Sequence, residues 1–193
     1  AKDEAGSPNV IGVIALATAL TVLEELGLDK IEHHEQSLID YALGKFGRIP
    51  GLKIYGSPQP QDVNRLGVMS FELEGYHHVL VAGLLAFYGG IGVRSGCFCA
   101  QPYIQRLLGL DGTALARLRH DLYTGKARHL PGLVRISFGM YNSPEELDRL
   151  VEALQVILSY SPRYWQEQLV WDDSLECYIP RDKRFTLGIE PIS

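Results

Sequence analysis

Two cysteines, Cys97 and Cys99, lie one residue apart in a segment whose residue types could support covalent chemistry. Gly96 precedes them and permits a sharp turn. Pro102 follows them and is typical of the first turn of a helix, because a proline there gives up no hydrogen bond. We therefore predict a loop that carries both cysteines, followed by a helix over residues 102–108.

The predicted surroundings of Cys99 favour a reactive thiolate. The apolar residues 91–93 are typical of the end of a strand, and this would place Arg94 at the mouth of the loop. The positive end of the following helix and the guanidinium of Arg94 would both stabilise a negative sulfur. From these residues alone, two half-buried structural cysteines in a turn are an equally good interpretation.

Composition bounds the rest of the chain. It has 193 residues, 46% of them hydrophobic and 21% charged, which is enough for one globular domain with its own core. The net charge of −5 and the lack of a basic stripe argue against nucleic acid as a partner. Three cysteines are too few for a disulfide framework and indicate a reducing compartment, so we predict a cytoplasmic location.

The first predicted helix is unusually apolar. Ser7 is a candidate N-cap with Pro8 in the first turn, and the helix should run to about Leu26 before Gly27 ends it. Residues 10–23 are apolar on all sides, yet they are too few to span a bilayer, so we predict no membrane association. We infer that another domain or subunit covers this helix; the alternative is an ordinary central helix.

Hydrophobic periodicity predicts the remaining elements. A second helix should start near Asp29, with Glu32 as its capping-box partner, and Ser143 should start a later one. Strands are expected over residues 52–55, 67–73 and 133–138, and helices over residues 79–88 and within 111–131. This order predicts an α+β, α/β sandwich-like fold, with a small mixed or antiparallel sheet and helices on one face.

Three motifs resemble those of one enzyme family. Residues 4–9, Glu-Ala-Gly-Ser-Pro-Asn, resemble the Glu-Ala-Gly-Thr-Pro-Asn motif of class V aminotransferase-fold enzymes. Residues 94–102 resemble the Arg-x-Gly-x-x-Cys-Ala-x-Pro motif of cysteine desulfurases and selenocysteine lyases, and residues 134–143 resemble their Arg-x-Ser-x-x-x-Tyr-Asn-Thr motif. Order and spacing agree across about residues 4–158, so the chain is identified as a member of this family.

The resemblance implies the C-terminal part of a fold type I enzyme that uses pyridoxal 5′-phosphate (PLP) and is normally a homodimer. Residues 1–27 would be an interdomain helix that packs on a large domain outside this chain. Residues 28–160 would be the small domain, and residues 161–193 a C-terminal extension. The family's Schiff-base lysine lies upstream of the Glu-Ala-Gly motif, so neither Lys2 nor any other lysine here is given that role, and the chain alone is expected to be inactive.

The resemblance also assigns roles to individual residues. Cys99 aligns with the nucleophile that takes sulfur from PLP-bound cysteine as a persulfide. Arg135 aligns with the arginine that binds the substrate carboxylate, and Arg94 with one that borders the same pocket. Ser7 aligns with a threonine that reaches the PLP phosphate of the partner subunit. Cys97 is expected to pack, with a relay thiol as the alternative. The implied partners are L-cysteine or selenocysteine and a sulfur-acceptor protein.

Other functions stay open at this point. The Cys-Phe-Cys sequence, followed by the insert at residues 111–131, also resembles the desulfurase domain of molybdenum-cofactor sulfurases. The shorter desulfurases lack this insert and the tail from Ser161. A class V epimerase or lyase, in which Cys99 is incidental, and a non-catalytic interaction domain are further alternatives. A metal site is not expected, because Cys97, Cys99, His77 and His78 do not by themselves specify four ligands.

Overall fold

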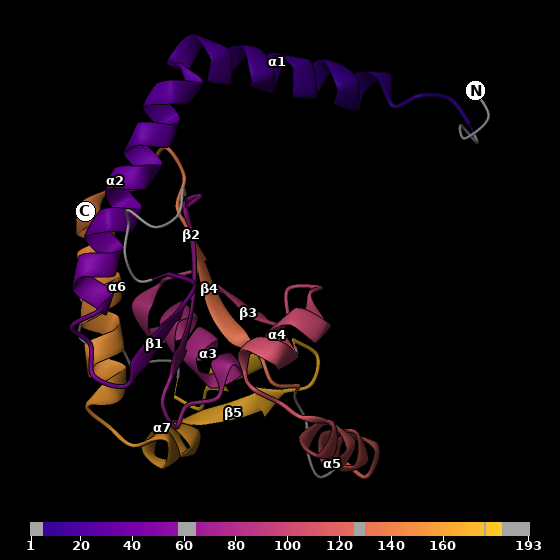
Figure 1. The fold of residues 1–193 in the computed structure, drawn as a ribbon, viewed down its shortest axis with the longest axis vertical. Coiled ribbons are helices and arrows are strands. Elements are labelled where there is room, and N and C mark those ends of the chain that lie inside the picture. Colours follow the sequence, from indigo (N-terminus) through magenta and orange to yellow (C-terminus); the bar gives the residue numbers. More distant parts are fainter. Residues whose placement is uncertain (1–5, 58–64, 126–129, 176, 183–193) are drawn as a thin grey trace.

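Seven helices and six strands are present in the part of the chain that the structure, a computed structural model, describes: residues 6–57, 65–125, 130–175 and 177–182 (Figure 1). In chain order they are α1 (Val10–Leu26), α2 (Leu28–Phe46), β1 (Leu52–Tyr55), β2 (Val68–Leu73), α3 (His78–Gly89), β3 (Arg94–Gly96), α4 (Gln101–Leu107), α5 (Gly112–Tyr123), β4 (Leu133–Ser137), α6 (Pro144–Leu158), α7 (Pro162–Gln168), β5 (Leu169–Asp172) and β6 (Cys177–Pro180).

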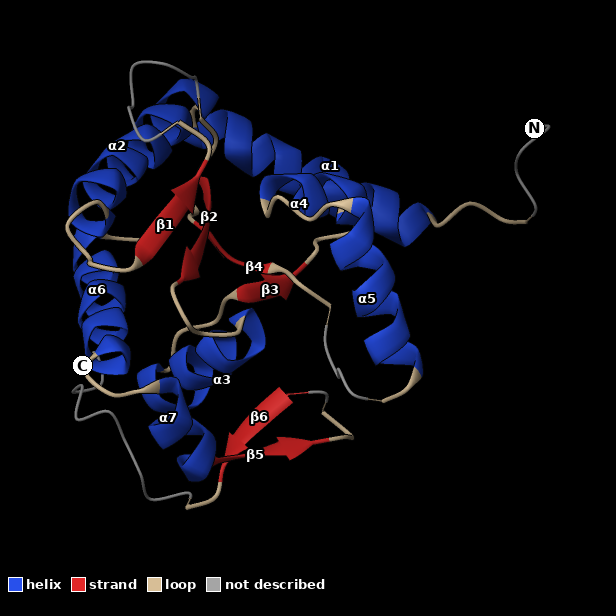
Figure 2. Ribbon diagram, turned by 60° about the horizontal axis from the view of Figure 1, so that its bottom comes forward, coloured by secondary structure: helices blue, strands red, loops and turns tan. Residues whose placement is uncertain are grey.

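The main sheet has four antiparallel strands in the order β1-β2-β4-β3 (Figure 2). Helices α2, α3 and α6 bury their apolar faces against one side of it, and these helices with β2 and β4 supply most of the core. A separate pair, β5 and β6, packs beside α3. The predicted α+β class, with a small antiparallel sheet, is therefore confirmed.

The alternation predicted for residues 67–73 is present in β2. Met69 and Phe71 are buried there, while Ser70 between them lies on the opposite face and is half-buried. The strand predicted at residues 91–93 is wrong by three residues, because pairing with β4 begins at Arg94. Residues 91–93 follow the left-handed cap of α3, and the amide of Ile91 still bonds to a helix carbonyl.

Helix starts were predicted with mixed success. The capping box of α6 is confirmed, since Ser143 and Glu146 each bond to the other's backbone. Ser7 is not the cap of α1, because the side chain of Asn9 accepts a 3.0 Å bond from Gly12 instead. Asp29 is also not a cap. Helix α2 begins one residue earlier, directly after Gly27, so that Asp29 lies inside its first turn.

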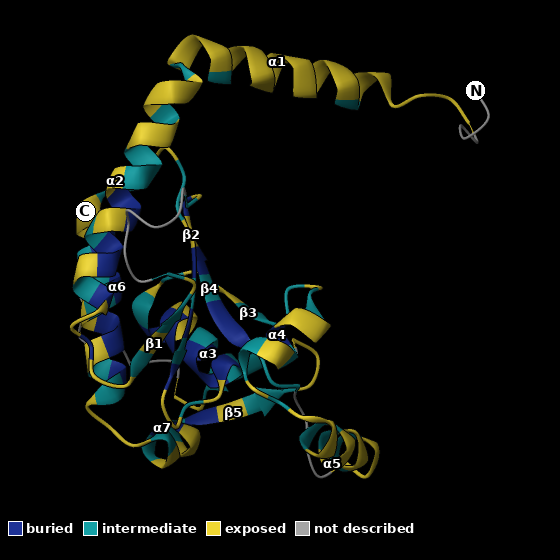
Figure 3. Ribbon diagram, in the orientation of Figure 1, coloured by how far each residue is buried: buried dark blue, intermediate teal, exposed yellow. Residues whose placement is uncertain are grey.

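Helix α1 extends away from the rest of the domain, and none of its residues is buried (Figures 1 and 3). Ile11 is 82% exposed and Val13 is 63% exposed. The bend of 76° between α1 and α2 occurs at Gly27, whose φ of 92° favours glycine. No single described helix is long and apolar enough to cross a membrane; α1 and α2 together meet such a criterion by length and composition only.

The segment after Ser161 contributes to the same core. The side chain of Trp165 is fully buried and its indole N–H donates a 2.9 Å bond to the carbonyl of Ile157. Strand β6 lies so close to α3 that a Cβ at Gly83 would be 3.1 Å from the carbonyl oxygen of Tyr178. The proposed division at residue 160 stays a prediction, but α7 and the start of β5 pack as part of the domain.

Candidate active site

One row of side chains crosses all four strands of the main sheet on the face opposite the core. The strand register places Tyr55 beside Ser70, Ser70 beside Arg135, and Arg135 beside Arg94. The core side is identified by Phe71, which alternates with Ser70 on β2 and is fully buried. Val134 and Ile136, the neighbours of Arg135 in β4, are buried in the core, so Arg135 faces the other way.

Arg94 and Arg135 occupy opposite positions on adjacent strands, so two positive charges share one face. Like charges in directly opposed positions destabilise a sheet. The Nε atom of Arg135 is buried and has no hydrogen-bond acceptor among the described residues. No carboxylate forms an ion pair with either arginine in the part of the chain that is described. This arrangement suits an anion, and a planar carboxylate is the natural partner of a guanidinium.

The two cysteines belong to a tight turn between β3 and α4. The amide of Ala100 donates a 2.8 Å bond to the carbonyl of Cys97, which closes a four-residue turn. Its central residues, Phe98 and Cys99, have φ values of 52° and 59°. Two positive φ values in succession usually require Asn or Gly. The turn holds Cys99 at its tip, where the residue is exposed, two residues before α4 begins.

An aromatic contact joins this turn to the arginine row, the cross-strand row that contains Arg94 and Arg135. The guanidinium carbon of Arg135 lies 4.9 Å from the centre of the Phe98 ring. This distance is within the range of a cation–π interaction. Because Phe98 directly precedes Cys99, the contact brings the cysteine turn beside the Arg135 guanidinium.

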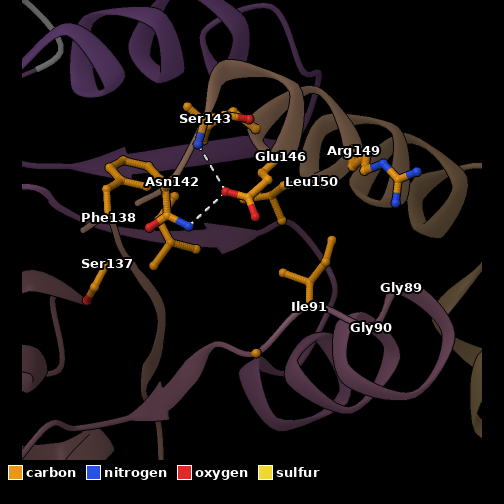
Figure 4. A pocket seen from close by; sticks show the side chains of 13 residues that line it. Gly89, Gly90, Ile91, Ser137, Phe138, Asn142, Ser143, Glu146, Arg149 and Leu150 are labelled. Atoms are coloured by element: carbon orange, nitrogen blue, oxygen red, sulfur yellow. Dashed lines mark hydrogen bonds between the residues drawn. The ribbon is translucent and has the colours of Figure 1, made fainter. Parts of the chain in front are cut away.

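A pocket of about 410 Å³ lies on another side of β4 and is lined by α3, the loop after it and the start of α6 (Figure 4). Its walls include Ser137, Asn142 and Glu146, and the Glu146 carboxylate accepts bonds from the Asn142 side chain and the Ser143 amide. None of Cys99, Arg94 and Arg135 lines this pocket. The chemistry-bearing residues therefore lie on the open face of the sheet rather than in this hollow.

Comparisons with known proteins identify the family of the chain. Residues 1–150 match the aminotransferase class V family, which is most of the chain. The chain belongs to the class V aminotransferase family. Cysteine desulfurases of Escherichia coli (strain K12 / DH10B) and Klebsiella pneumoniae are 39% and 38% identical to it over 156 residues. These matches cover 81% of this chain and 32% of each relative, so the chain spans about a third of their length.

Two solved class V structures share the fold. The Escherichia coli cysteine desulfurase CsdA, in an S-sulfonic acid form, is 30% identical with a TM-score of 0.62, covering 82% of this chain and 33% of that one. The apo cysteine desulfurase of Thermococcus onnurineus NA1 is 30% identical with a TM-score of 0.65, covering 81% and 33%. The α+β arrangement described above is thus shared with about a third of each of these two structures.

The remaining predicted site residue, Ser7, is not brought to the arginine row. It is exposed in the segment before α1, at the end of the helix that points away from the domain (Figure 1). Its predicted contact is with the partner subunit, and this stays a prediction.

The other two cysteines differ from Cys99 in their surroundings. Cys97 is half-buried at the first position of the turn. Cys177 is half-buried in β6, and burial, with a smaller effect from Asp172, raises the pKa of its thiol.

No three His, Cys, Asp or Glu side chains gather as a metal site within the described ranges. The rings of His77 and His78, at the start of α3, have centres 4.3 Å apart and are tilted by 35° to each other.

Sequence reasoning missed two connections. Asn142, within the third motif, bonds through its side chain to Gly139 and Glu146, and its carbonyl contacts His34 of α2 at 3.0 Å. The motif itself was the available signal for this residue. Phe98 was not singled out, and no local pattern marks it, because its partner Arg135 lies in a distant strand.

Proposed function

We propose that this chain is the C-terminal part of a PLP-dependent cysteine desulfurase in which Cys99 receives sulfur from the substrate. The observation that carries the proposal is the placement of the exposed Cys99 turn against Arg135 through Phe98. A sulfur-accepting thiol and a carboxylate-binding group must lie together for this reaction, and they come from segments far apart in the sequence.

The arginine row binds and orients the amino-acid substrate. Arg135, whose Nε has no acceptor among the described residues, holds the carboxylate. Arg94, directly opposite on β3, adds a second positive charge at the border of the same site. Fixing the carboxylate in this way leaves the substrate side chain free to lie toward the Cys99 turn, and such orientation is itself a large contribution to rate.

Cys99 then carries out the transfer as a thiolate. Its sulfur forms a bond to the substrate sulfur while the substrate carbon–sulfur bond breaks. The electron pair of the broken bond leaves with the three-carbon fragment, which takes up a proton and departs as alanine. The sulfur remains on Cys99 as a persulfide. Because Cys99 is exposed at a turn tip, an acceptor protein can reach this persulfide.

The described residues fit the substrate end of a PLP site. Arg135, whose buried Nε has no acceptor among the described residues, and the neighbouring Arg94 would hold the carboxylate, and Ser7 would reach the phosphate in a partner subunit. When bound, PLP supplies an electron sink. The family resemblance places the cofactor lysine upstream of residues 4–9, so the described lysines Lys30, Lys45 and Lys53 are given no role in holding PLP.

We also propose that α1 packs on a part of the full-length protein outside this chain, and that the whole enzyme is a cytoplasmic homodimer. The exposed apolar side chains of α1 support this, because contiguous apolar surface of this kind is typical of an interface. Residues 1–27 would then be the interdomain helix, residues 28–160 the small domain and residues 161–193 the extension.

The test is the substitution Cys99→Ser in the full-length enzyme, with Cys97→Ser as the matched control. We expect Cys99→Ser to abolish sulfide release from L-cysteine and Cys97→Ser to retain most of it. Sulfide release that survives in Cys99→Ser would favour a class V epimerase or lyase. Loss of sulfide release in both variants would favour a relay role for the Cys97 thiol. A persulfide passed only to a molybdenum cofactor would favour the sulfurase alternative.

A further inference from the structure

We propose that Phe98 is a positioning residue for sulfur transfer: its ring rests on the Arg135 guanidinium and holds the Cys99 turn at the place where the substrate carboxylate binds. The inference rests on the proposed function and names a residue that none of the family motifs requires. It assigns to Phe98 no contact with the substrate itself.

The first support is that no carboxylate among the described residues pairs with Arg94 or Arg135. Arg94 and Arg135 are adjacent positive charges, and neither has a carboxylate partner in the described ranges. The Phe98 ring, 4.9 Å from the guanidinium carbon, is the group that faces Arg135 from the loop. The negative face of an aromatic ring stabilises a cation without neutralising it, so the arginine stays available to a carboxylate.

The second support is the backbone of the turn. Phe98 and Cys99 both adopt the left-handed region, at φ values of 52° and 59°, although neither is Gly or Asn. Side chains with a Cβ disfavour this region, and residues persist there only where their surroundings hold them. The Ala100–Cys97 hydrogen bond closes the turn, and the ring on Arg135 is the side-chain contact that holds it against the sheet.

Together these contacts make the position of Cys99 depend on Arg135. Cys99 directly follows the anchored residue, so a ring that leaves Arg135 releases the cysteine. A carboxylate that binds Arg135 offsets the positive charge under the Phe98 ring. Its binding should therefore change how firmly the ring holds Cys99, and with it the reactivity of the Cys99 thiol. Phe98→Leu removes the aromatic face but keeps an apolar side chain, and Phe98→Tyr keeps the ring.

The experiment measures the alkylation of Cys99 by iodoacetamide in the full-length enzyme, with Cys97 quantified in the same peptide as an internal reference. Rates are compared without and with L-alanine, which carries the carboxylate but no sulfur. We expect L-alanine to change the Cys99 rate in the wild type and in Phe98→Tyr. In Phe98→Leu we expect a faster rate without L-alanine, by about 3- to 30-fold as the loss of one cation–π contact implies, and no response to L-alanine.

Steady-state kinetics supply the second readout. In Phe98→Leu we expect kcat for L-cysteine to fall about 3- to 30-fold with little change in KM, because Arg135 still binds the carboxylate. If Phe98→Leu matches the wild type in alkylation and in kcat while Cys99→Ser is inactive, the positioning role is wrong and the proposed function stands. If Cys99→Ser retains sulfide release, the proposed function itself fails. Should Phe98→Leu not fold, Phe98→Met takes its place with the same expectations.

Discussion

Arg94 and Arg135 face each other directly across the antiparallel pair formed by β3 and β4. In most sheets such a pair of like charges is avoided, because no cross-strand partner offsets the repulsion. In this protein the two arginines lie on the face of the sheet that is next to the Cys99 turn. The Phe98 ring of that turn contacts Arg135. The pair therefore indicates an anion-binding site that is completed by its ligand.

The first prediction concerns this pair. Arg135→Lys keeps the charge but loses the two-pronged geometry, so we expect kcat/KM for L-cysteine in the full-length enzyme to fall about 10- to 100-fold. Arg94→Lys should cost less, because Arg94 only borders the site. Arg163→Gln on α7, where Arg163 pairs with Glu167 at 3.4 Å, is the control and should leave the kinetics unchanged. Equal, small effects at Arg135 and Arg163 would contradict the assignment.

A second prediction tests whether the segment after Ser161 belongs to the core. Trp165 is fully buried, so Trp165→Ala should lower the free energy of unfolding by about 3–5 kcal/mol. Trp165→Phe should cost about 1–2 kcal/mol, because the carbonyl of Ile157 still accepts a bond from the Tyr160 amide. Urea unfolding followed by circular dichroism measures both. A loss below about 1 kcal/mol in Trp165→Ala would mean that the segment is only loosely attached.

A third prediction concerns acid stability. Lys45, and then Tyr41, hold the pKa of Asp148 below its usual 3.8, and these contacts tie α2 to α6. A carboxyl whose folded-state pKa is depressed stabilises the fold at pH values above 3.8, and the benefit is lost as the pH falls further. At neutral pH the wild type should therefore have a higher melting temperature than Asp148→Asn. The difference between the two melting temperatures should vanish as the pH falls below 3.8. Curves that stay parallel in acid would disprove this link.

A fourth prediction concerns the chain alone. Because its described lysines include two held in ion pairs, and the family lysine is expected upstream, the isolated chain should bind no PLP covalently. Incubation with PLP and borohydride, followed by intact-mass measurement, checks this. A stoichiometric adduct on one lysine of this chain would overturn the prediction, whereas scattered labelling of several lysines would match an unspecific reaction.

The sequence predicted local structure well where one residue type had one physical role. The capping box at Ser143 and the alternation in residues 67–73 were both confirmed, because hydrogen-bonding geometry and burial leave few alternatives there. Ser7 failed as a cap because Asn9, two residues later, competes for the same helix end. The strand near residue 91 was misplaced because apolar residues also follow a helix that ends on the core.

The composition of the site was harder to predict than the fold. Motif spacing pointed to Cys99, Arg94 and Arg135 separately, and their roles in catalysis stay proposals. Their meeting depends on strand register, which is set by the buried residues Val134 and Ile136 on the other face of β4. The contact of Phe98 with Arg135 has no local signature, since it exists only after the sheet and the turn have formed.

The strand order has a consequence for biosynthesis. Strand β4 is the last of the four in sequence, yet it lies between β2 and β3 and pairs with both. Until residue 137 has left the ribosome, β3 has no strand to pair with and β2 is paired only with β1. Translation is slow relative to hairpin formation, so one edge of β2 and both edges of β3 stay unpaired until β4 has been synthesised. The arginine pair forms only with the final strand, because a nascent chain that stops before β4 carries Arg94 and Cys99 but lacks Arg135.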